Sequence, residues 1–230
     1  MATTFSKDSN PAKKYIAFFD LDQTITRSIS GKELARGAFR NGLMTRYDLV
    51  NAIFLSLLFR LELKDPLKII DKMVRWVEGI SEKTIVDLCS EVFLEVLLPS
   101  VYDEARSEIE FHKGENAKVV ILSSALAPVC NDMAKDLGFD DVICSDLEVK
   151  NGYYTGRPLG HVCFGEEKAI RLKEYCEKNS ILPSDSWYYG DSISDLSALS
   201  VVGHPVCVNP DKKLRKTAIK RNWKILYWKS

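Results

Sequence analysis

The stretch Tyr15–Thr24, YIAFFDLDQT, decides the fold of this chain. Its first five residues form an apolar run, rich in aromatic and β-branched side chains, that stops at Asp20. Such a run is typical of a strand buried on both faces in the middle of a parallel sheet. We therefore predict a central parallel strand with acidic residues at its carboxyl end.

Predicted strands and helices alternate over the second half of the chain. The apolar runs that predict strands lie at 118–122, 141–144, 187–189, 205–208 and 223–228, and Asn151–Gly152 predicts a β-hairpin at 147–154. This alternation predicts an α/β fold with a doubly wound parallel sheet. In such sheets ligands bind beyond the carboxyl ends of the strands.

A long block between the first two strands carries apolar residues only at helical spacing. We therefore predict an N-terminal arm at 1–14, a core domain of residues 15–29 and 111–230, and an inserted helical cap at 30–110. The most apolar window of the cap, Leu49–Leu63, contains Asn51, Arg60 and Glu62 and falls short of a membrane span. It predicts a helix buried on most sides, with contact to a membrane surface as the alternative.

Composition limits the partners of the chain. Its 230 residues include 32 basic and 32 acidic side chains, so no basic excess supports nucleic-acid binding. The N-terminus lacks the apolar segment of a signal peptide, and the six cysteines form no CxxC pair. We expect a cytoplasmic protein with reduced thiols and no stable membrane insertion. The oligomeric state is left open.

Polar residues follow the predicted strands where a site is expected. Asp20 and Asp22 follow the first strand, Ser123 the second, and Asp191 the strand at 187–189, while Lys168 begins a predicted helix. Three converging aspartates repel one another unless a cation neutralises them, and oxygen-only ligands favour Mg²⁺. Such a site suits phosphoryl chemistry on a small-molecule phosphate ester.

The chemistry of these side chains suggests their roles. Ser123 and Lys168 offer a hydroxyl and a cation to a phosphate group. Asp20 is then feasible as a nucleophile, because a metal ion and Lys168 reduce its repulsion from the phosphate. Asp22, two residues on, can donate a proton to the leaving group and later accept one from water.

The set DLDQT, Ser123-Ser124, Lys168 and GDSISD resembles the four-motif pattern of the haloacid dehalogenase superfamily, in its phosphoserine phosphatase-like subfamily IB with a type-1 helical cap and a β-hairpin flap. The resemblance implies a magnesium-dependent phosphatase in which Asp20 forms an aspartyl-phosphate. The residues that it implies are, for catalysis, Asp20, Asp22, Ser123 and Lys168; for phosphate binding, Thr24, Ser123, Ser124, Lys168 and Ser194; for the metal, Asp20, Asp22 and Asp191; and in support, Ser192 and Asp195.

Four positions depart from the phosphoserine phosphatase pattern. Ile29 stands where a glutamate recognises the substrate amine, Ser124-Ala125 stands for Gly-Gly, and Ser194 stands for asparagine. We therefore expect a phosphatase of another small phosphorylated metabolite, and Arg27 suggests a more anionic one. The alternatives are a phosphoserine phosphatase, a lipid-phosphate phosphatase and a non-catalytic regulatory protein on the same fold.

Overall fold

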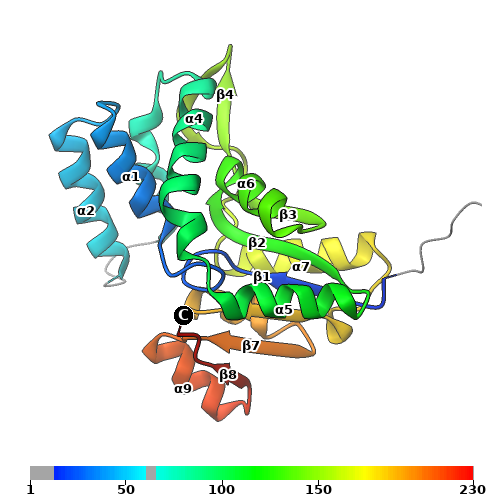
Figure 1. The fold of residues 1–230 in the computed structure, drawn as a ribbon. Helices are drawn as coiled ribbons and strands as arrows, with labels where there is room; N and C mark the ends of the chain where they lie inside the picture. The colour runs from blue at the N-terminus through cyan, green and yellow to red at the C-terminus, as the bar shows by residue number, and fades with distance from the viewer. Residues whose placement is uncertain (1–12, 61–65, 230) are drawn as a thin grey trace, which may run out of the picture.

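A computed structural model describes residues 13–60 and 66–229 of the chain (Figure 1). The predicted arm at 1–14 therefore lies almost entirely outside the described residues, as does the end of the apolar window that begins at Leu49.

A six-stranded parallel sheet forms the centre of the core, in the order β3-β2-β1-β6-β7-β8. Its strands are β1 (Ile16–Phe19), β2 (Lys118–Leu126), β3 (Asp141–Ser145), β6 (Trp187–Gly190), β7 (His204–Val208) and β8 (Lys224–Leu226). All four residues of β1 are buried, which accords with its place between two other strands. The predicted α/β fold with a doubly wound parallel sheet is confirmed.

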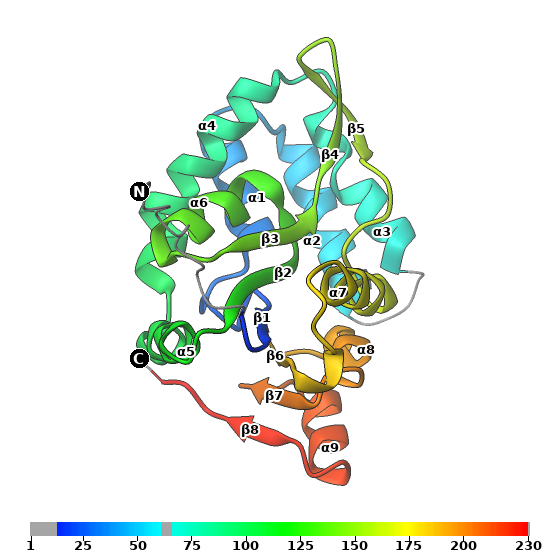
Figure 2. The same cartoon turned by 90° about the vertical axis from the view of Figure 1, so that its right-hand side faces the viewer.

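Helices cover both faces of this sheet, as Figure 2 shows. Residues of α5 (Asp103–Gly114) and α6 (Ala127–Leu137) share one apolar cluster with alternate residues of β1 and β2. Residues of α7 (Glu166–Lys178), α8 (Leu196–Leu199) and α9 (Lys212–Lys220) form the second cluster, on the other face. The two clusters require a strand buried on both sides, and this explains the uninterrupted apolar run of β1.

Among the residues that the structure describes, the inserted block contains helices joined by turns and no strand. It contains α1 (Ser30–Arg40), α2 (Arg46–Arg60), α3 (Pro66–Met73), the 3₁₀ turn η1 (Arg75–Val77), α4 (Glu82–Val92), the π-helical segment η2 (Phe93–Leu97) and the 3₁₀ turn η3 (Leu98–Ser100). The entry and exit of the block lie side by side, because Thr26 bridges Val101 and the Tyr102 N–H donates to the Ile25 carbonyl. The domain division stays a prediction, and the packing of α5 against β2 favours a boundary near residue 102.

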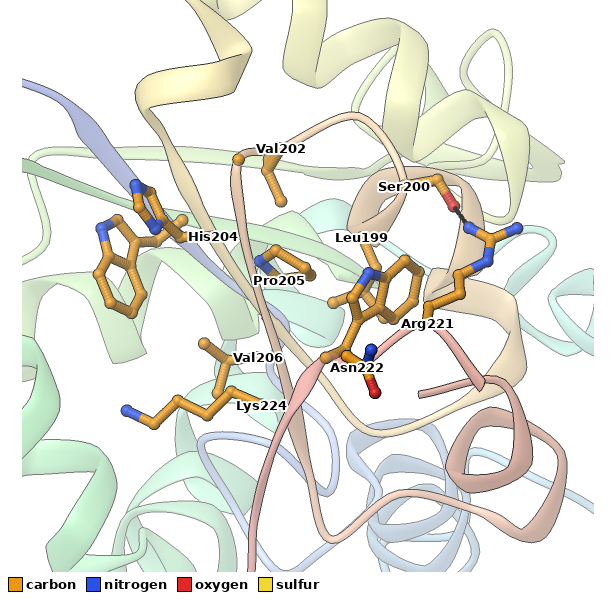
Figure 3. A pocket seen from close by; sticks show the side chains of 12 residues that line it. Leu199, Ser200, Val202, His204, Pro205, Val206, Arg221, Asn222 and Lys224 are labelled. Atoms are coloured by element: carbon orange, nitrogen blue, oxygen red, sulfur yellow. Dashed lines mark hydrogen bonds between the residues drawn. The ribbon is translucent and has the colours of Figure 1, made fainter. Parts of the chain in front are cut away.

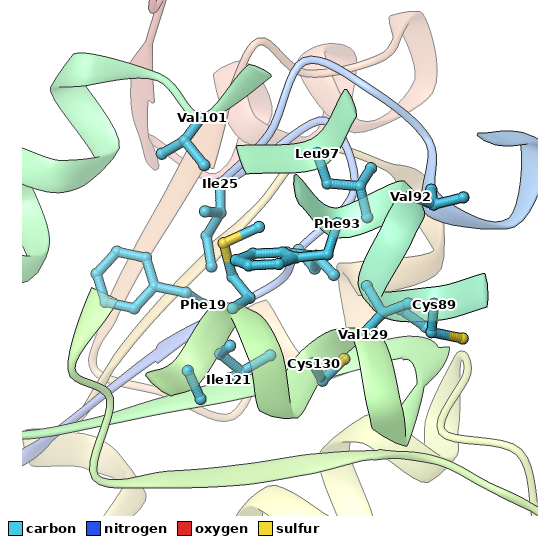
Figure 4. Packing of buried hydrophobic residues seen from close by; sticks show 14 of the residues in the cluster. Phe19, Ile25, Cys89, Val92, Phe93, Leu97, Val101, Ile121, Val129 and Cys130 are labelled. Carbon is cyan, nitrogen blue, oxygen red and sulfur yellow. The ribbon is translucent and has the colours of Figure 1, made fainter. Parts of the chain in front are cut away.

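The block packs onto the core through one continuous apolar cluster (Figure 4). Cys89 and Val92 of α4 and Phe93 of η2 are at most 6% exposed and meet Val129 and Cys130 of α6. Burial of this kind contributes about 25 cal/mol per Å² of apolar surface. The helical block is therefore held to the core by side-chain packing as well as by its two linkers.

The predicted hairpin consists of β4 (Leu147–Lys150) and β5 (Tyr153–Pro158). Its turn residues Asn151 and Gly152 have φ of 53° and 79°, the left-handed backbone that this dipeptide tolerates. The turn contacts the start of α4, where the Glu82 N–H donates to the Gly152 carbonyl at 2.9 Å. The hairpin is thus attached to the helical block.

Two expectations about individual elements were wrong. β2 does not end before Ser123 but continues to Leu126, with a register shift against β3 between Leu122 and Leu126. The prediction ended the strand early because Ser123 and Ser124 break its apolar run. In addition, the described side chains of α2 are not buried on most sides, since Val50 and Ile53 are 64% and 62% exposed. Among the described helices, none has both the length and the apolar character needed to cross a bilayer.

His112 of α5 ties the helix to the sheet through a buried hydrogen-bond chain. The Tyr189 hydroxyl donates to Glu108 at 2.6 Å, so it accepts from Nε2 of His112, 2.8 Å away. Nδ1 is then the unprotonated nitrogen and accepts from the Tyr15 hydroxyl at 2.9 Å. Burial is the main cause that lowers the pKa of His112 to about 4. The folded protein therefore holds this histidine neutral at pH values where the unfolded chain protonates it.

This difference predicts acid sensitivity of the fold. Between pH 6.5 and 4 the unfolded state binds more protons at His112, so the free energy of unfolding falls as the pH falls through this window. We expect the titration of His112 to lower the free energy of unfolding by about 3 kcal/mol as the pH falls from 6.5 to 4. Above pH 6.5 this contribution to stability is fully present. Urea unfolding at a series of pH values tests this, with His112→Gln as the variant that does not titrate. An equal pH dependence in both proteins would contradict it.

Candidate active site

Asp20 lies at the carboxyl end of β1, at the centre of the sheet. Its backbone N–H donates to the Tyr189 carbonyl of β6 at 2.9 Å, so the neighbouring strand fixes its position. The side chain is buried, at 6% exposure for the residue. Burial raises the pKa of Asp20, and the nearby Lys168 ammonium and Ser123 hydroxyl oppose that rise.

Lys168 lies in the first turn of α7, a helix that covers one face of the sheet, and its side chain reaches the Asp20 carboxylate. Its Nζ donates to Oδ1 of Asp20 at 2.9 Å and to Oδ1 of Asp195 at 2.6 Å, and the residue is only 2% exposed. Burial by itself lowers the pKa of Lys168, but Asp195 and Asp20 outweigh it and raise the pKa well above its usual value. Lys168 is therefore a fixed, buried cation between two carboxylates.

Asp195 belongs to a 3₁₀ turn, η5 (Ile193–Asp195), that follows β6. The Ser192 N–H donates to its Oδ2 at 3.2 Å, and the Tyr188 hydroxyl donates to its Oδ1 at 2.7 Å. A Cβ on Gly190 would come within 2.8 Å of this carboxylate, so the strand end requires glycine there. The local sequence thus holds Asp195 rigidly against Lys168.

Asp191 completes an acidic group that could hold a cation. Oxygen atoms of Asp20, Asp191 and Asp195 all lie within 4.8 Å of one another. Burial, followed by Asp195 and Asp20, raises the pKa of Asp191 well above its usual range. Within the described residues no hydrogen bond to the Asp191 carboxylate is found. An uncompensated carboxylate in an oxygen-only cluster fits a hard divalent ion.

Asp22 lies two residues beyond Asp20 and points toward the helical block. Its two carboxylate oxygens accept from the N–H and the hydroxyl of Ser30, at 2.8 and 2.9 Å. Burial raises the pKa of Asp22 to about 7, against the lowering effect of Ser30. Because Ser30 begins α1, the helical block itself orients this carboxyl group.

The remaining predicted residues differ in how they meet the site. Ser123 is 1% exposed and interacts with Asp20, whereas Ser124 is half-buried. The Thr24 hydroxyl is buried and has no hydrogen-bond partner among the described residues. Ser194 bonds to Ser192 through their hydroxyls at 2.6 Å. The structure brings Ser123 to Asp20 and leaves direct phosphate contacts of Thr24, Ser124 and Ser194 as predictions.

The Arg27 side chain does not face the acidic cluster. Its guanidinium donates to the Pro99 carbonyl at 3.4 Å and lies 5.7 Å from the ring centre of Tyr102. These contacts belong to the linkers of the helical block. They give no support to the expectation that Arg27 selects an anionic substrate.

Two residues of the site were missed by the sequence reasoning. Tyr188 bonds to both Lys168 and Asp195, yet in the run WYY it is indistinguishable from a core aromatic. Ser30 holds Asp22, and nothing in the sequence marks it, since it stands eight residues away in a different predicted domain. The residues that hold the carboxylates of the candidate site in place are thus the hardest to predict from the sequence.

A pocket of about 450 Å³ lies at the opposite end of the sheet (Figure 3). It is lined by the amino ends of β6, β7 and β8, including Trp187, His204 and Lys224. Asp20 and Asp191 follow the carboxyl ends of their strands, so this pocket is separate from the candidate active site.

The fold and the site together define an α/β enzyme whose acidic cluster and buried lysine lie beyond the carboxyl ends of the central strands. The sequence pattern of the haloacid dehalogenase-like hydrolases matches residues 17–200, and the chain belongs to this family. It is 30% identical over 220 residues to a probable phosphatase of Mycobacterium tuberculosis, covering 94% of this chain and 76% of the relative. A histidinol-phosphatase of Neisseria meningitidis is 26% identical, over 94% of this chain and all of that protein. The chain is accordingly a phosphatase of the phosphoric monoester hydrolase class.

Solved structures support the same fold. A protein of unknown function from Bordetella pertussis superposes with a TM-score of 0.85 at 23% identity, over 94% of this chain and 99% of that one. A substrate-bound phosphoserine phosphatase superposes with a TM-score of 0.73 at 18% identity, over 93% of each chain. The resemblance to phosphoserine phosphatase-like members of the family is therefore confirmed at the level of fold.

Proposed function

We propose that this phosphatase hydrolyses a small phosphorylated metabolite with Mg²⁺, through an aspartyl-phosphate on Asp20. The observation that carries the proposal is the buried contact of Asp20 with Lys168, 2.9 Å apart, next to the carboxylates of Asp191 and Asp195. Lys168 neutralises part of the negative charge that would otherwise repel a phosphate dianion from the Asp20 carboxylate. Structural ion pairs also occur in protein cores, but this one sits where α/β enzymes bind ligands.

In the first step, a carboxylate oxygen of Asp20 forms a bond to phosphorus as the bond from phosphorus to the leaving oxygen breaks. Asp22 donates its proton to the leaving oxygen. The two hydrogen bonds from Ser30 hold the Asp22 carboxyl group in place for this transfer. Ser123 and Lys168 hold the phosphoryl oxygens. Bound at Asp20, Asp191 and the Asp22 carbonyl, Mg²⁺ would supply positive charge to the transferring phosphoryl group.

In the second step, water attacks the phosphorus of the aspartyl-phosphate, and the bond to the Asp20 oxygen breaks. Asp22 accepts the proton of the attacking water and so regains its starting state. Inorganic phosphate leaves, and the Asp20 carboxylate returns to its contact with Lys168. Asp195, fixed by Ser192 and Tyr188, keeps the lysine aligned throughout.

We propose that the substrate is a phosphate ester other than phosphoserine. Ile29, 41% exposed, stands where the phosphoserine phosphatase pattern has the amine-recognising glutamate, and an apolar side chain cannot replace that carboxylate. A relative matched over its full length is named a histidinol-phosphatase, so histidinol phosphate belongs in a substrate panel. Phosphoserine itself remains the second candidate, because a phosphoserine phosphatase shares this fold.

Magnesium dependence tests the proposal most simply. We expect p-nitrophenyl phosphate turnover with Mg²⁺ and a loss of about 100-fold or more after chelation with EDTA, reversed by added Mg²⁺. Asp191→Asn should raise the Mg²⁺ concentration that gives half-maximal rate. Asp185→Asn, on an exposed turn, is the matched control and should behave as the parent protein. Full activity in EDTA, or no turnover across p-nitrophenyl phosphate, phosphoserine and histidinol phosphate, would rule the proposal out.

A further inference from the structure

The pocket at the amino ends of β6, β7 and β8 has the features of a second ligand site (Figure 3). Its volume of about 450 Å³ lies within the range of small-molecule sites, about 300–1,000 Å³. It lies at the end of the sheet opposite to Asp20, so a ligand bound there leaves the acidic cluster free. We refer to it as the amino-end pocket.

One side of the amino-end pocket is aromatic. The His204 ring stacks on the Trp187 ring, with ring centres 4.6 Å apart and planes inclined by 16°. The parallel pairing of β6 with β7 places these two residues next to each other. His204 is exposed, and among the described residues no second ring stacks on it. A planar ring of a ligand can therefore extend the stack on His204.

The other side of the pocket presents a fixed guanidinium group. Arg221 and Ser200 lie across the pocket from His204, as Figure 3 shows. Nη1 of Arg221 donates to the Ser200 hydroxyl at 2.7 Å, and the guanidinium carbon lies 5.0 Å from the ring centre of Trp223. These two neutral partners hold the guanidinium in place without cancelling its charge. Its remaining N–H groups can donate to the oxygens of a phosphate.

The charge of the amino-end pocket is positive. Its described lining residues include Arg221 and Lys224 and no acidic side chain. Neither of these two cations forms an ion pair with a carboxylate of the described residues. Arg221 directly follows α9 (KKLRKTAIK), a helix that adds five basic residues and no acidic one. Asp211 caps the start of that helix, at the end away from Arg221. The pocket therefore favours an anion.

The two sides of the pocket together select the class of ligand. Inorganic phosphate or a sugar phosphate would leave the aromatic side unused, and a neutral aromatic molecule would leave the guanidinium without an anion. A nucleotide carries a planar base and a phosphate group on one molecule. Stacking on an aromatic side chain is open to every base, because every base has a π-face.

We propose that the amino-end pocket binds a nucleotide, with the base stacked on His204 and the phosphate at Arg221 and Ser200. The inference concerns a second site, and it holds whichever phosphate ester is hydrolysed at Asp20.

Isothermal titration calorimetry of the full chain with ADP tests the inference. EDTA in the buffer removes the divalent ions that the proposed hydrolysis requires, so ADP stays intact during the titration. We expect saturable binding of ADP. Adenosine lacks the anion and pyrophosphate lacks the ring, so each should bind about tenfold more weakly or worse.

Two substitutions address the two sides of the pocket separately. Arg221→Glu should raise the Kd of both ADP and pyrophosphate by about tenfold or more, because the phosphate loses its cation and meets a negative charge. His204→Ala should raise the Kd of ADP by about fivefold or more and leave that of pyrophosphate unchanged. The matched control is Lys220→Glu, the same charge change at the exposed neighbouring position, outside the pocket lining. It should bind ADP nearly as the parent protein does, because solvent and salt screen an exposed charge.

Thermal unfolding of the three variants confirms that each is folded, and the readout does not depend on phosphatase activity. Four results would overturn the inference. The first is no saturable binding of ADP at millimolar concentration. The second is equal ADP affinity of the parent protein and Arg221→Glu, which would place ADP at another site such as the acidic cluster. The third is an equal loss in Arg221→Glu and Lys220→Glu, which would indicate general electrostatic attraction. The fourth is pyrophosphate binding as tight as that of ADP, or an unchanged ADP affinity in His204→Ala, since either would leave a phosphate site without a site for the base.

Discussion

In the Asp20→Asn variant we expect turnover of p-nitrophenyl phosphate to fall by about 10³-fold or more. Asparagine has nearly the same shape and still offers an oxygen to Lys168, 2.9 Å away in the parent protein. It lacks the negative charge of the nucleophile and cannot form the acyl phosphate. The loss should therefore appear in kcat rather than in the fold of the protein.

The stability of this variant separates a catalytic role from a structural one. Asp20 is one of three carboxylates within 4.8 Å, and burial already raises its pKa. Removing its charge relieves repulsion, so we expect the free energy of unfolding to stay the same or to rise. Asp185→Asn, at an exposed position, should leave both rate and stability unchanged. Retained activity in Asp20→Asn would exclude Asp20 as the nucleophile.

Replacing Lys168 by methionine should damage both activity and stability. Its ammonium is the cation that contacts both Asp20 and Asp195, at 2.9 and 2.6 Å. Without it, we expect kcat to fall by about 10²- to 10³-fold, because the phosphoryl group loses a charged donor. We also expect the free energy of unfolding to fall by about 3–5 kcal/mol, because two buried carboxylates are left without their partner.

A second substitution separates these two effects. In Lys168→Met/Asp195→Asn, one of the uncompensated charges is removed, so part of the stability should return while the activity stays low. Lys173→Met, at an exposed position of the same helix, is the matched control. Chemical unfolding and steady-state rates measure both quantities. A Lys168→Met protein with parental kcat would show that the lysine is only a structural ion-pair partner.

The sheet could be predicted from the sequence because each of its strands contains a short apolar run. The expected strand at 187–189 is observed as Trp187–Gly190, and the hairpin turn falls at Asn151–Gly152. Buried parallel strands have little freedom in composition, so their pattern is strong. The end of β2 was missed because Ser123 and Ser124 serve the site and interrupt the apolar pattern.

The candidate site was only partly predictable. Asp20, Lys168 and Asp191 follow or face strand ends, and the structure brings them together as expected. Asp195 was expected only as a supporting residue, yet its carboxylate belongs to the acidic cluster. Chain topology determines which polar residue meets which strand end, and spacing along the sequence does not reveal it.

The exposure of α2 could not be predicted from the sequence, for a different reason. An apolar pattern shows which faces of a helix are apolar. It does not show whether other elements of the same chain pack against those faces. The window around Ile53 and Phe54 predicted burial, and the structure leaves these side chains 62% and 54% exposed. The apolar composition of this window therefore does not reveal how much of the helix the rest of the chain covers.

Trapping the phosphoenzyme tests the central claim most directly. The protein is mixed with excess p-nitrophenyl phosphate and Mg²⁺, quenched in acid during the first turnover, digested and analysed by mass spectrometry. The account predicts one phosphoryl group on the peptide that contains Asp20, and none in the Asp20→Asn variant. A phosphoryl group on another residue would contradict it. So would an unmodified Asp20 peptide at a time when one equivalent of p-nitrophenol has been released in a burst.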